Sequence, residues 1–184
     1  MARSTKHTPN SSGGYEPDYA ARVKAAKRAW PDGPWQREAD QERWTSGRVY
    51  ALILRSSGSG HWCGYVGVPC PNREASNQLY RLLSRFSSFG DGRAITFGPR
   101  ATASPLTEFL SEPDPSPNMI WVGWDASHMS DFTPEQASRM PADAIRSNLS
   151  SYTTIDQARD ATNTWAINLH RIVEVLASGA SVKG

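Results

Sequence analysis

The sequence has little cysteine, little net charge and no long apolar run, and each shortage excludes a class of protein. Its two cysteines, Cys63 and Cys70, have neither a zinc-binding nor a redox C-x-x-C spacing, so we expect reduced, structural thiols. No apolar stretch approaches the roughly 20 residues that span a bilayer, and the first residues lack the apolar core of a secretory signal. We therefore expect a cytoplasmic protein with no membrane partner.

The charges of the chain nearly cancel. There are 20 Lys and Arg residues against 18 Asp and Glu residues, which leaves a net charge of +2. Proteins that hold duplex nucleic acid through its phosphates carry much stronger and more clustered positive charge. Duplex nucleic acid is therefore an improbable partner, and single strands are disfavoured for the same reason. A small-molecule ligand or a host protein is the partner that we expect.

The length of the chain limits how many domains it can form. With 184 residues, it can form one ordinary hydrophobic core but not two comfortable ones. Residues 1–15 and 178–184 are mostly small and polar and show no apolar pattern, which predicts a disordered tail at each end. Residues 16–177 are then expected to form a single domain.

Three segments carry apolar residues at helical spacing. They cover residues 16–30, 75–86 and 154–176, and the last is the longest and most regular. Thr154 and Thr133 each begin a sequence that matches a capping box, so a helix is expected to start at each of them. The helix expected over residues 154–176 has an apolar stripe, and we expect this stripe to pack on one face of a sheet.

Strands are predicted where β-branched and aromatic residues concentrate. Residues 49–54 and 62–68 are joined by a Ser/Gly-rich turn, which predicts a hairpin. Residues 119–124 form a third strand, and a short strand over 94–97 is expected to stop at Gly98. The irregular order of helices and strands indicates an α+β fold, with a small mixed or antiparallel sheet covered by the C-terminal helix.

Polar side chains follow the third strand at the point where it ends. Asp125, His128 and Asp131 come directly after Trp124, and strand ends are common places for ligand-binding loops. Imidazole titrates near neutral pH, so His128 is a candidate general acid or base, with Asp125 orienting its ring and Asp131 as a second orienting group.

Two other interpretations of this segment remain open. Asp125, His128 and Asp131 together could hold a divalent metal ion, since imidazole and carboxylate suit zinc, manganese or iron. Alternatively, all three could be structural, with Asp131 or Thr133 capping a helix and Asp125 bonding backbone amides in the turn. No serine lies in a G-x-S-x-G motif and Cys63 lies inside a strand, so covalent catalysis is poorly supported.

The seven tryptophans allow a second kind of site. Partly exposed indoles at Trp62 and Trp124 could stack on a planar ligand while arginines pair with its phosphate. Trp124 and Tyr65 would then line the pocket. The alternative is that the indoles only fill the core. The arginines that this hypothesis considers are Arg55, Arg93 and Arg100.

Two motifs resemble those of a family of small uncharacterised proteins from bacteria and their phages. Residues 63–69 resemble its C-G-Y-V-G-V-P strand, and residues 123–131 resemble its G-F-D-x-x-H-x-x-D block. The likeness runs from about residue 35 to about residue 169. The family has an H-G-G-L-T segment where this chain has Gly-Arg-Ala-Ile-Thr. If that histidine serves chemistry in the family, the resemblance implies that this chain has either lost the activity or replaced the histidine with Arg93 or His61. The resemblance implies an architecture and a phage or prophage origin, with no mechanism attached.

We therefore expect a phage- or prophage-type accessory protein that binds or processes a small polar molecule around Asp125 and His128. A nucleotide-like ligand fits the aromatic residues and arginines, which together with His61 would complete the site. The alternative is a non-catalytic protein that docks on a host protein or sequesters a host signalling molecule. Whether a divalent metal takes part is left open by the sequence.

Overall fold

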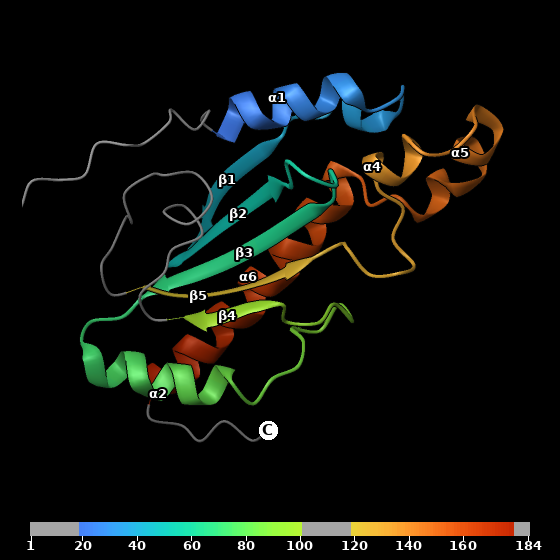
Figure 1. Ribbon diagram of the computed structural model, residues 1–184. Helices are drawn as coiled ribbons and strands as arrows, with labels where there is room; N and C mark the ends of the chain where they lie inside the picture. The colour runs from blue at the N-terminus through green and yellow to red at the C-terminus, as the bar shows by residue number, and fades with distance from the viewer. Residues whose placement is uncertain (1–18, 101–118, 179–184) are drawn as a thin grey trace, which may run out of the picture.

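A five-stranded sheet lies at the centre of the computed structural model, which describes residues 19–100 and 119–178 (Figure 1). All neighbouring strands pair antiparallel, so the predicted α+β fold is confirmed and its sheet is antiparallel. The strand order across the sheet is β1-β2-β3-β5-β4. The strands are β1 Gln41–Ser46, β2 Val49–Arg55, β3 Trp62–Pro69, β4 Phe97–Arg100 and β5 Met119–Asp125.

The predicted hairpin is present, and β2 pairs with β3 over six residues, from Tyr50 opposite Gly67 to Arg55 opposite Trp62. The edge strands differ more from expectation. Strand β1 was not predicted, because it is largely polar and half-exposed, as is common at a sheet edge. Strand β4 begins at Phe97 and continues through Gly98, so the expected strand over 94–97 is misplaced.

Helices α6 (Ile155–Ala177) and α2 (Arg73–Leu83) cover one face of the sheet, and α6 runs behind it in Figure 1. The capping box at Thr154 is formed as predicted, with its hydroxyl accepting from the Gln157 amide. Close approach of α6 depends on Gly64, where a Cβ would overlap Thr162 and Trp124. This face holds the larger hydrophobic core.

Helix α1 (Tyr19–Ala29) lies on the opposite face of the sheet. Its Tyr19 and Val23 pack against residues that point to that side from the strands, including Leu54 and Tyr65. Residues 16–18, where we expected this helix to begin, lie outside the described part of the chain. Thus the sheet has an α6 face and an α1 face, and the α1 face carries the smaller core.

A third group of packed side chains lies at one end of the sheet, around the short helices α4 (Pro134–Ala137) and α5 (Ala142–Asn148). The helix predicted to start at Thr133 is α4, whose capping box is formed, whereas α5 was not predicted. In this group Trp35 meets two other rings edge to face. The ring centroid of Tyr152 is 5.3 Å from that of Trp35, and the ring centroid of Phe132 is 6.2 Å from it.

Within the described residues, no helix is long and apolar enough to cross a membrane. The expected tails, 1–15 and 178–184, lie outside those residues except for Ser178, which caps α6. Both cysteines are free thiols, as predicted.

Candidate functional site

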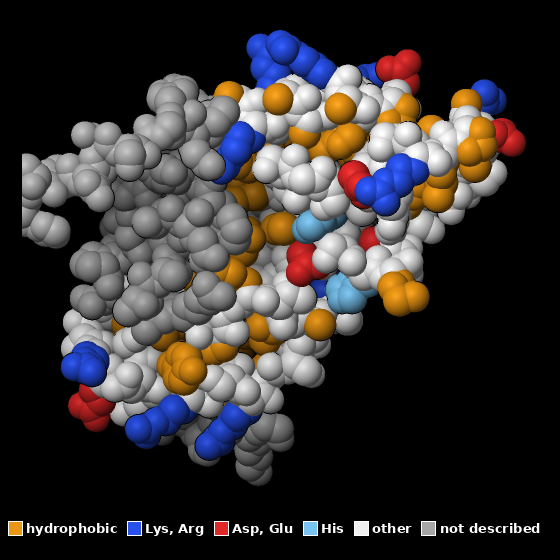
Figure 2. Space-filling view, viewed as in Figure 1, with side chains coloured by type: hydrophobic (Ala, Val, Ile, Leu, Met, Phe, Trp, Pro, Cys, Tyr) orange, Lys and Arg blue, Asp and Glu red, His pale blue; other side chains and the backbone are white. Residues whose placement is uncertain are grey.

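A cavity of about 400 Å³ lies at one end of the sheet, on its α1 face. Figure 2 shows histidine and acidic side chains gathered beside a hollow in which hydrophobic side chains are visible. The cavity brings together residues from α1, the turn after β2, and strands β3, β4 and β5. Its lining comprises Tyr19, Arg22, Leu54, Arg55, Ser56, Ser57, His61, Cys63, Tyr65, Thr96, Phe97, Trp124 and Asp125.

The strand register explains why the polar groups converge. Cys63 and Asp125 are direct partners across β3 and β5, and Tyr65 is opposite Gly123. Side chains of paired residues in an antiparallel sheet point to the same face, so all of these point toward α1. His61 comes immediately before β3 and lies at the same end of the sheet as Asp125.

Asp125 is held as a carboxylate by its neighbours. Burial by itself would raise its pKa, but hydrogen bonds from Ser127 and Thr96 and the nearby imidazole of His61 outweigh burial and hold the pKa below the usual range. The backbone amide of Ser127 donates to Oδ1 at 3.1 Å, and its hydroxyl donates to the same oxygen. The cavity therefore contains a fixed negative charge at neutral pH.

His61 is the titratable partner of Asp125. Burial lowers the pKa of His61, and the negative charges of Asp125 and Asp131 oppose this shift without cancelling it. The ring is therefore neutral at neutral pH. Its Nδ1 lies 2.6 Å from the hydroxyl oxygen of Ser59, which is within hydrogen-bonding distance.

Cys63 cannot serve as a nucleophile in this setting. Burial and the nearby Asp125 carboxylate raise the pKa of its thiol to about 12, against the smaller opposing effect of a hydrogen bond with Tyr65. A thiol is a poor nucleophile until it loses its proton.

The cavity also has an aromatic wall. Tyr65 and Phe97 meet there edge to face, with 5.1 Å between their ring centroids.

Only some of the predicted site residues meet in this cavity. His61, Tyr65, Trp124 and Asp125 line it. His128 does not: its side chain is about half-exposed, and its ring Nδ1 lies 3.3 Å from Asp131.

In the loop after β5, the carboxylates of Asp125 and Asp131 have different partners from those that we expected. The carboxylate of Asp131 accepts the backbone amide of His128 at 2.9 Å, and the Asp131 amide returns to the His128 carbonyl at 2.9 Å. Asp125 faces His61 and bonds to Ser127, so the expected pairing of Asp125 with His128 is not formed. Thr133, not Asp131, caps α4.

No group of three or more His, Cys, Asp or Glu side chains is placed to hold a metal ion in the parts of the chain that the structure describes. The proposed ligand set of Asp125, His128 and Asp131 is therefore not assembled.

Trp62 and Trp124, the two indoles considered for stacking on a ligand, are buried, which favours the interpretation that they fill the core. Trp62 and Trp124 are at most 1% exposed. Each is covered by a guanidinium of the protein itself, with Arg55 at 4.2 Å from the Trp62 ring and Arg93 at 4.4 Å from the Trp124 ring. No ligand can stack on faces that are already occupied. The side chain of Arg100 lies outside the described residues.

Arg93 lines a second groove, which is more open than the cavity. Its guanidinium pairs with Asp91 at 3.3 Å. Both residues and Asp131 line a polar groove of about 550 Å³ beside the first half of α6. Arg93 is not among the residues that line the cavity.

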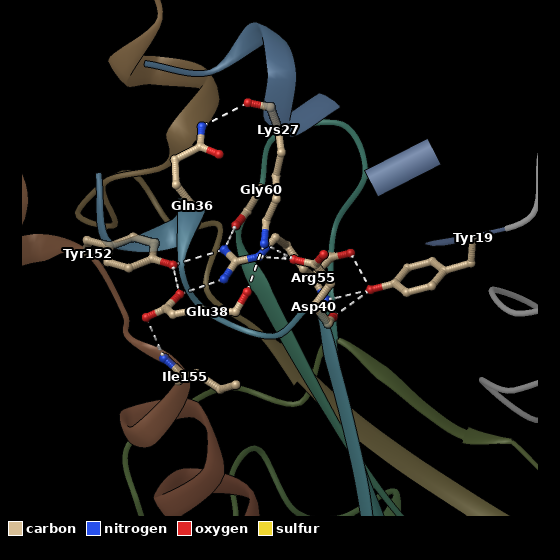
Figure 3. Close-up of polar contacts among 9 residues, drawn as sticks. All are labelled: Tyr19, Lys27, Gln36, Glu38, Asp40, Arg55, Gly60, Tyr152 and Ile155. Atoms are coloured by element: carbon tan, nitrogen blue, oxygen red, sulfur yellow. Dashed lines mark hydrogen bonds and ion pairs between the residues drawn. The ribbon is translucent and has the colours of Figure 1, made fainter. Parts of the chain in front are cut away.

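Arg55, at the end of β2, was considered from the sequence as a partner for a ligand phosphate, but the structure buries it completely among groups of the protein. Arg55 is 0% exposed, and its guanidinium contacts five groups, of which Figure 3 shows the four polar ones. It pairs with Glu38 and Asp40 and donates to the Gly60 carbonyl and the Tyr152 hydroxyl, both at 2.9 Å. The fifth group is the Trp62 ring beneath it.

The partners of Arg55 extend the network to other elements. Glu38 accepts the Ile155 amide at 3.1 Å, at the start of α6. Asp40 also pairs with Lys27 of α1 at 2.6 Å, and the Asp40 carbonyl accepts the Tyr19 hydroxyl at 2.8 Å. We call these residues, with Arg55, Gly60 and Tyr152, the Arg55 network. One feature of the sequence points to this network: Arg55 directly follows a continuous run of apolar residues.

Comparison with protein families, with curated proteins and with solved structures finds no match for this chain. The site must therefore be interpreted from its own geometry.

Proposed function

We propose that the protein binds a small polar molecule with a planar ring in the cavity on the α1 face, and processes it through His61 and Asp125. The observation that carries this proposal is that a neutral imidazole and a fixed carboxylate both line one cavity of about 400 Å³. Small-molecule sites commonly measure about 300 to 1,000 Å³ and combine apolar walls with a few converging polar groups.

The walls support a ring-shaped ligand. Tyr19, Leu54, Tyr65 and Phe97 supply apolar and aromatic surface, and the polar pair lies at one end. A nucleobase or nucleoside has this division between flat faces and a polar edge. The nucleotide-like ligand proposed from the sequence is therefore kept, with its base as the part that fits the cavity.

The proposal transfers the acid/base role from His128 to His61. A group that transfers a proton must lie within hydrogen-bonding reach of the ligand, and His61 lines the cavity whereas His128 does not. A neutral imidazole with a carboxylate nearby can take up a proton and have its new charge stabilised. The phage or prophage origin and the cytoplasmic location stay predictions from the sequence.

A ligand screen on the full chain tests this function. A panel of nucleobases, nucleosides and nucleotides is followed by thermal shift and calorimetry, because a ligand that binds only the folded state raises the midpoint. We expect a base-containing ligand to bind the parent and to bind about tenfold or more weakly to Asp125→Asn and His61→Gln, which remove polar contacts.

Two further variants show whether binding is in this cavity. Cys63→Met adds bulk to the cavity wall without changing charge and should block binding, whereas His128→Ala should bind like the parent. Binding that is lost in His128→Ala but survives in Cys63→Met would overturn the proposal. No binding by any compound would overturn it too and would turn attention to the docking alternative, tested by capture of host proteins.

A further inference from the structure

We infer that Ser59 fixes His61 as the tautomer with its proton on Nε2, so that the cavity selects planar rings with a lactam edge, meaning a ring carbonyl next to a ring N–H. His61 would then donate to the carbonyl and Asp125 would accept from the N–H. This inference rests on the proposed function and deepens it by naming the chemical class of the ligand and a positioning residue.

The ring of His61 has one nitrogen committed and one free. Nδ1 is 2.6 Å from the Ser59 hydroxyl oxygen, and this is the one hydrogen bond that the ring makes to any residue the structure describes. The ring also lines the cavity. Nε2 is therefore the nitrogen that remains for a ligand.

The surrounding charges decide which nitrogen carries the proton. A neutral imidazole has one N–H and one acceptor nitrogen, and the hydrogen bond at one nitrogen determines the state of the other. Asp125 also lines the cavity, and its negative charge favours a proton on the nitrogen that Ser59 does not engage, which is Nε2. The Ser59 hydroxyl then donates to the bare Nδ1 at 2.6 Å, and not to the Ser56 hydroxyl, which is the more distant acceptor at 3.4 Å.

The turn that carries Ser59 is held from several sides. The Gly60 carbonyl accepts from Arg55 at 2.9 Å, and the Ser59 carbonyl accepts the Glu135 amide at 3.1 Å. The Ser56 amide donates to the His61 carbonyl at 2.8 Å, which closes the turn. Ser59 is thus presented to the imidazole by a fixed backbone, as preorganised sites require.

Asp125 completes the pair as an acceptor. Its Oδ1 takes both hydrogen bonds from Ser127 and the carboxylate takes a third from Thr96, out of about four acceptor positions in all. Acceptor capacity therefore remains for a ligand N–H. A donor beside an acceptor matches a lactam edge, whereas a ring with an N-methyl group in place of the N–H would leave the carboxylate unpaired.

The tautomer is measured directly on the full chain labelled with ¹⁵N-histidine. Long-range ¹H–¹⁵N correlation spectra distinguish protonated from bare ring nitrogens, and His61→Gln identifies the signals. We expect an acceptor-type Nδ1 and a protonated Nε2 in the parent, with this preference lost in Ser59→Ala. The control is Ser57→Ala, a serine in the same turn that lines the cavity and makes no hydrogen bond to a described residue. A protonated Nδ1 in the parent, or an unchanged spectrum in Ser59→Ala, would overturn the inference.

The ligand class is tested with hypoxanthine and 1-methylhypoxanthine, which differ only at the lactam N–H. We expect the methylated base to bind about tenfold or more weakly, because an unpaired buried acceptor carries a desolvation cost. Ser59→Ala should weaken hypoxanthine binding while Ser57→Ala should not. Equal binding of both bases, with other planar ligands also bound, would overturn this inference and leave the proposed function standing. If no member of the whole panel binds, both fail.

Discussion

The Arg55 network and the His61–Asp125 pair lie on two sides of the same turn, but they differ in whether their polar atoms all have partners within the protein. The guanidinium of Arg55 is completely buried and has partners for every part of its fork. His61 has one ring nitrogen bonded and one left over, in a cavity. Both are buried polar clusters, but only one is closed.

The difference separates a structural role from a functional one. Buried charge is tolerated when it is paired and hydrogen-bonded, and a saturated network then specifies which elements meet. The unused ring nitrogen of His61 and the unused acceptor position of Asp125 have no such structural role, but a ligand in the cavity can form hydrogen bonds to both. The predictions that follow each change one side of this comparison.

The largest effect is expected from Arg55→Met. Removing the cation takes away the buried ion pair of Glu38 and leaves Asp40 paired with Lys27, and breaking a buried ion pair costs about 3 to 5 kcal/mol. The matched control is Arg159→Met, since Arg159 also pairs with two carboxylates, Glu42 and Asp156, but its side chain is 37% exposed. That change should cost about 1 kcal/mol or less. Urea unfolding measures both, and equal losses would contradict the distinction between the two ion-pair networks.

A smaller effect is expected at the glycine between the two clusters. Gly60 has φ +80°, and a Cβ there would overlap the ring of Pro134. Gly60→Ala should therefore add a packing cost of about 1 to 3 kcal/mol to the strain of a left-handed backbone. Gly92 has nearly the same φ, +81°, with open space around it, so Gly92→Ala isolates the strain alone. If thermal unfolding shows the two variants to be equally stable, Pro134 does not confine the turn as described.

The smallest effect is the pH dependence of stability. The pKa of His61 in the folded protein lies below its ordinary value of 6.5, so between these two values the unfolded chain binds more protons. Stability therefore falls as the pH falls below about 6.5 toward the folded pKa, and His61→Gln should flatten this decline.

Asp125 acts in a separate and more acidic window. Its folded pKa is below 3.8, so the stability that it contributes is present above that value and is lost as the pH falls through the folded pKa. Asp125→Asn should remove this contribution and leave the decline near neutral pH in place. Urea midpoints measured across the pH range test both assignments. A parent whose stability rises on acidification below pH 6.5 would contradict the neutral, buried state of His61.

Much of the fold could be predicted because its central elements bury a continuous or periodic apolar face. The pattern over residues 154–176 and the Thr154 capping box predicted α6, and the Ser/Gly-rich turn predicted the β2–β3 hairpin. The failures are elements without such a face. Strand β1 is a polar edge, and α5 is only seven residues long with one buried residue, Ile145.

The sequence located part of the cavity lining. Asp125 lies there because it ends the buried strand β5, and Tyr65 lines the same cavity. His128 lies outside the lining because three-residue spacing brings it to Asp131 in a local turn, not to Asp125. Ser59 was missed because a serine in a Ser/Gly-rich turn looks like ordinary turn chemistry. Only the structure shows that its hydroxyl meets an imidazole two residues later.

The Arg55 network also determines when the cavity can exist during synthesis. Every described lining residue has been made once Asp125 has been added to the chain. Yet the turn between β2 and β3 is held through Arg55 by Tyr152, and Glu38 is held by the Ile155 amide, 117 residues further along. A nascent chain on the ribosome, or one cut within α5, would carry all the chemical groups of the site without the support that aligns them. Assembly of the cavity is therefore expected to be a late event, completed only when the first turn of α6 reaches the sheet.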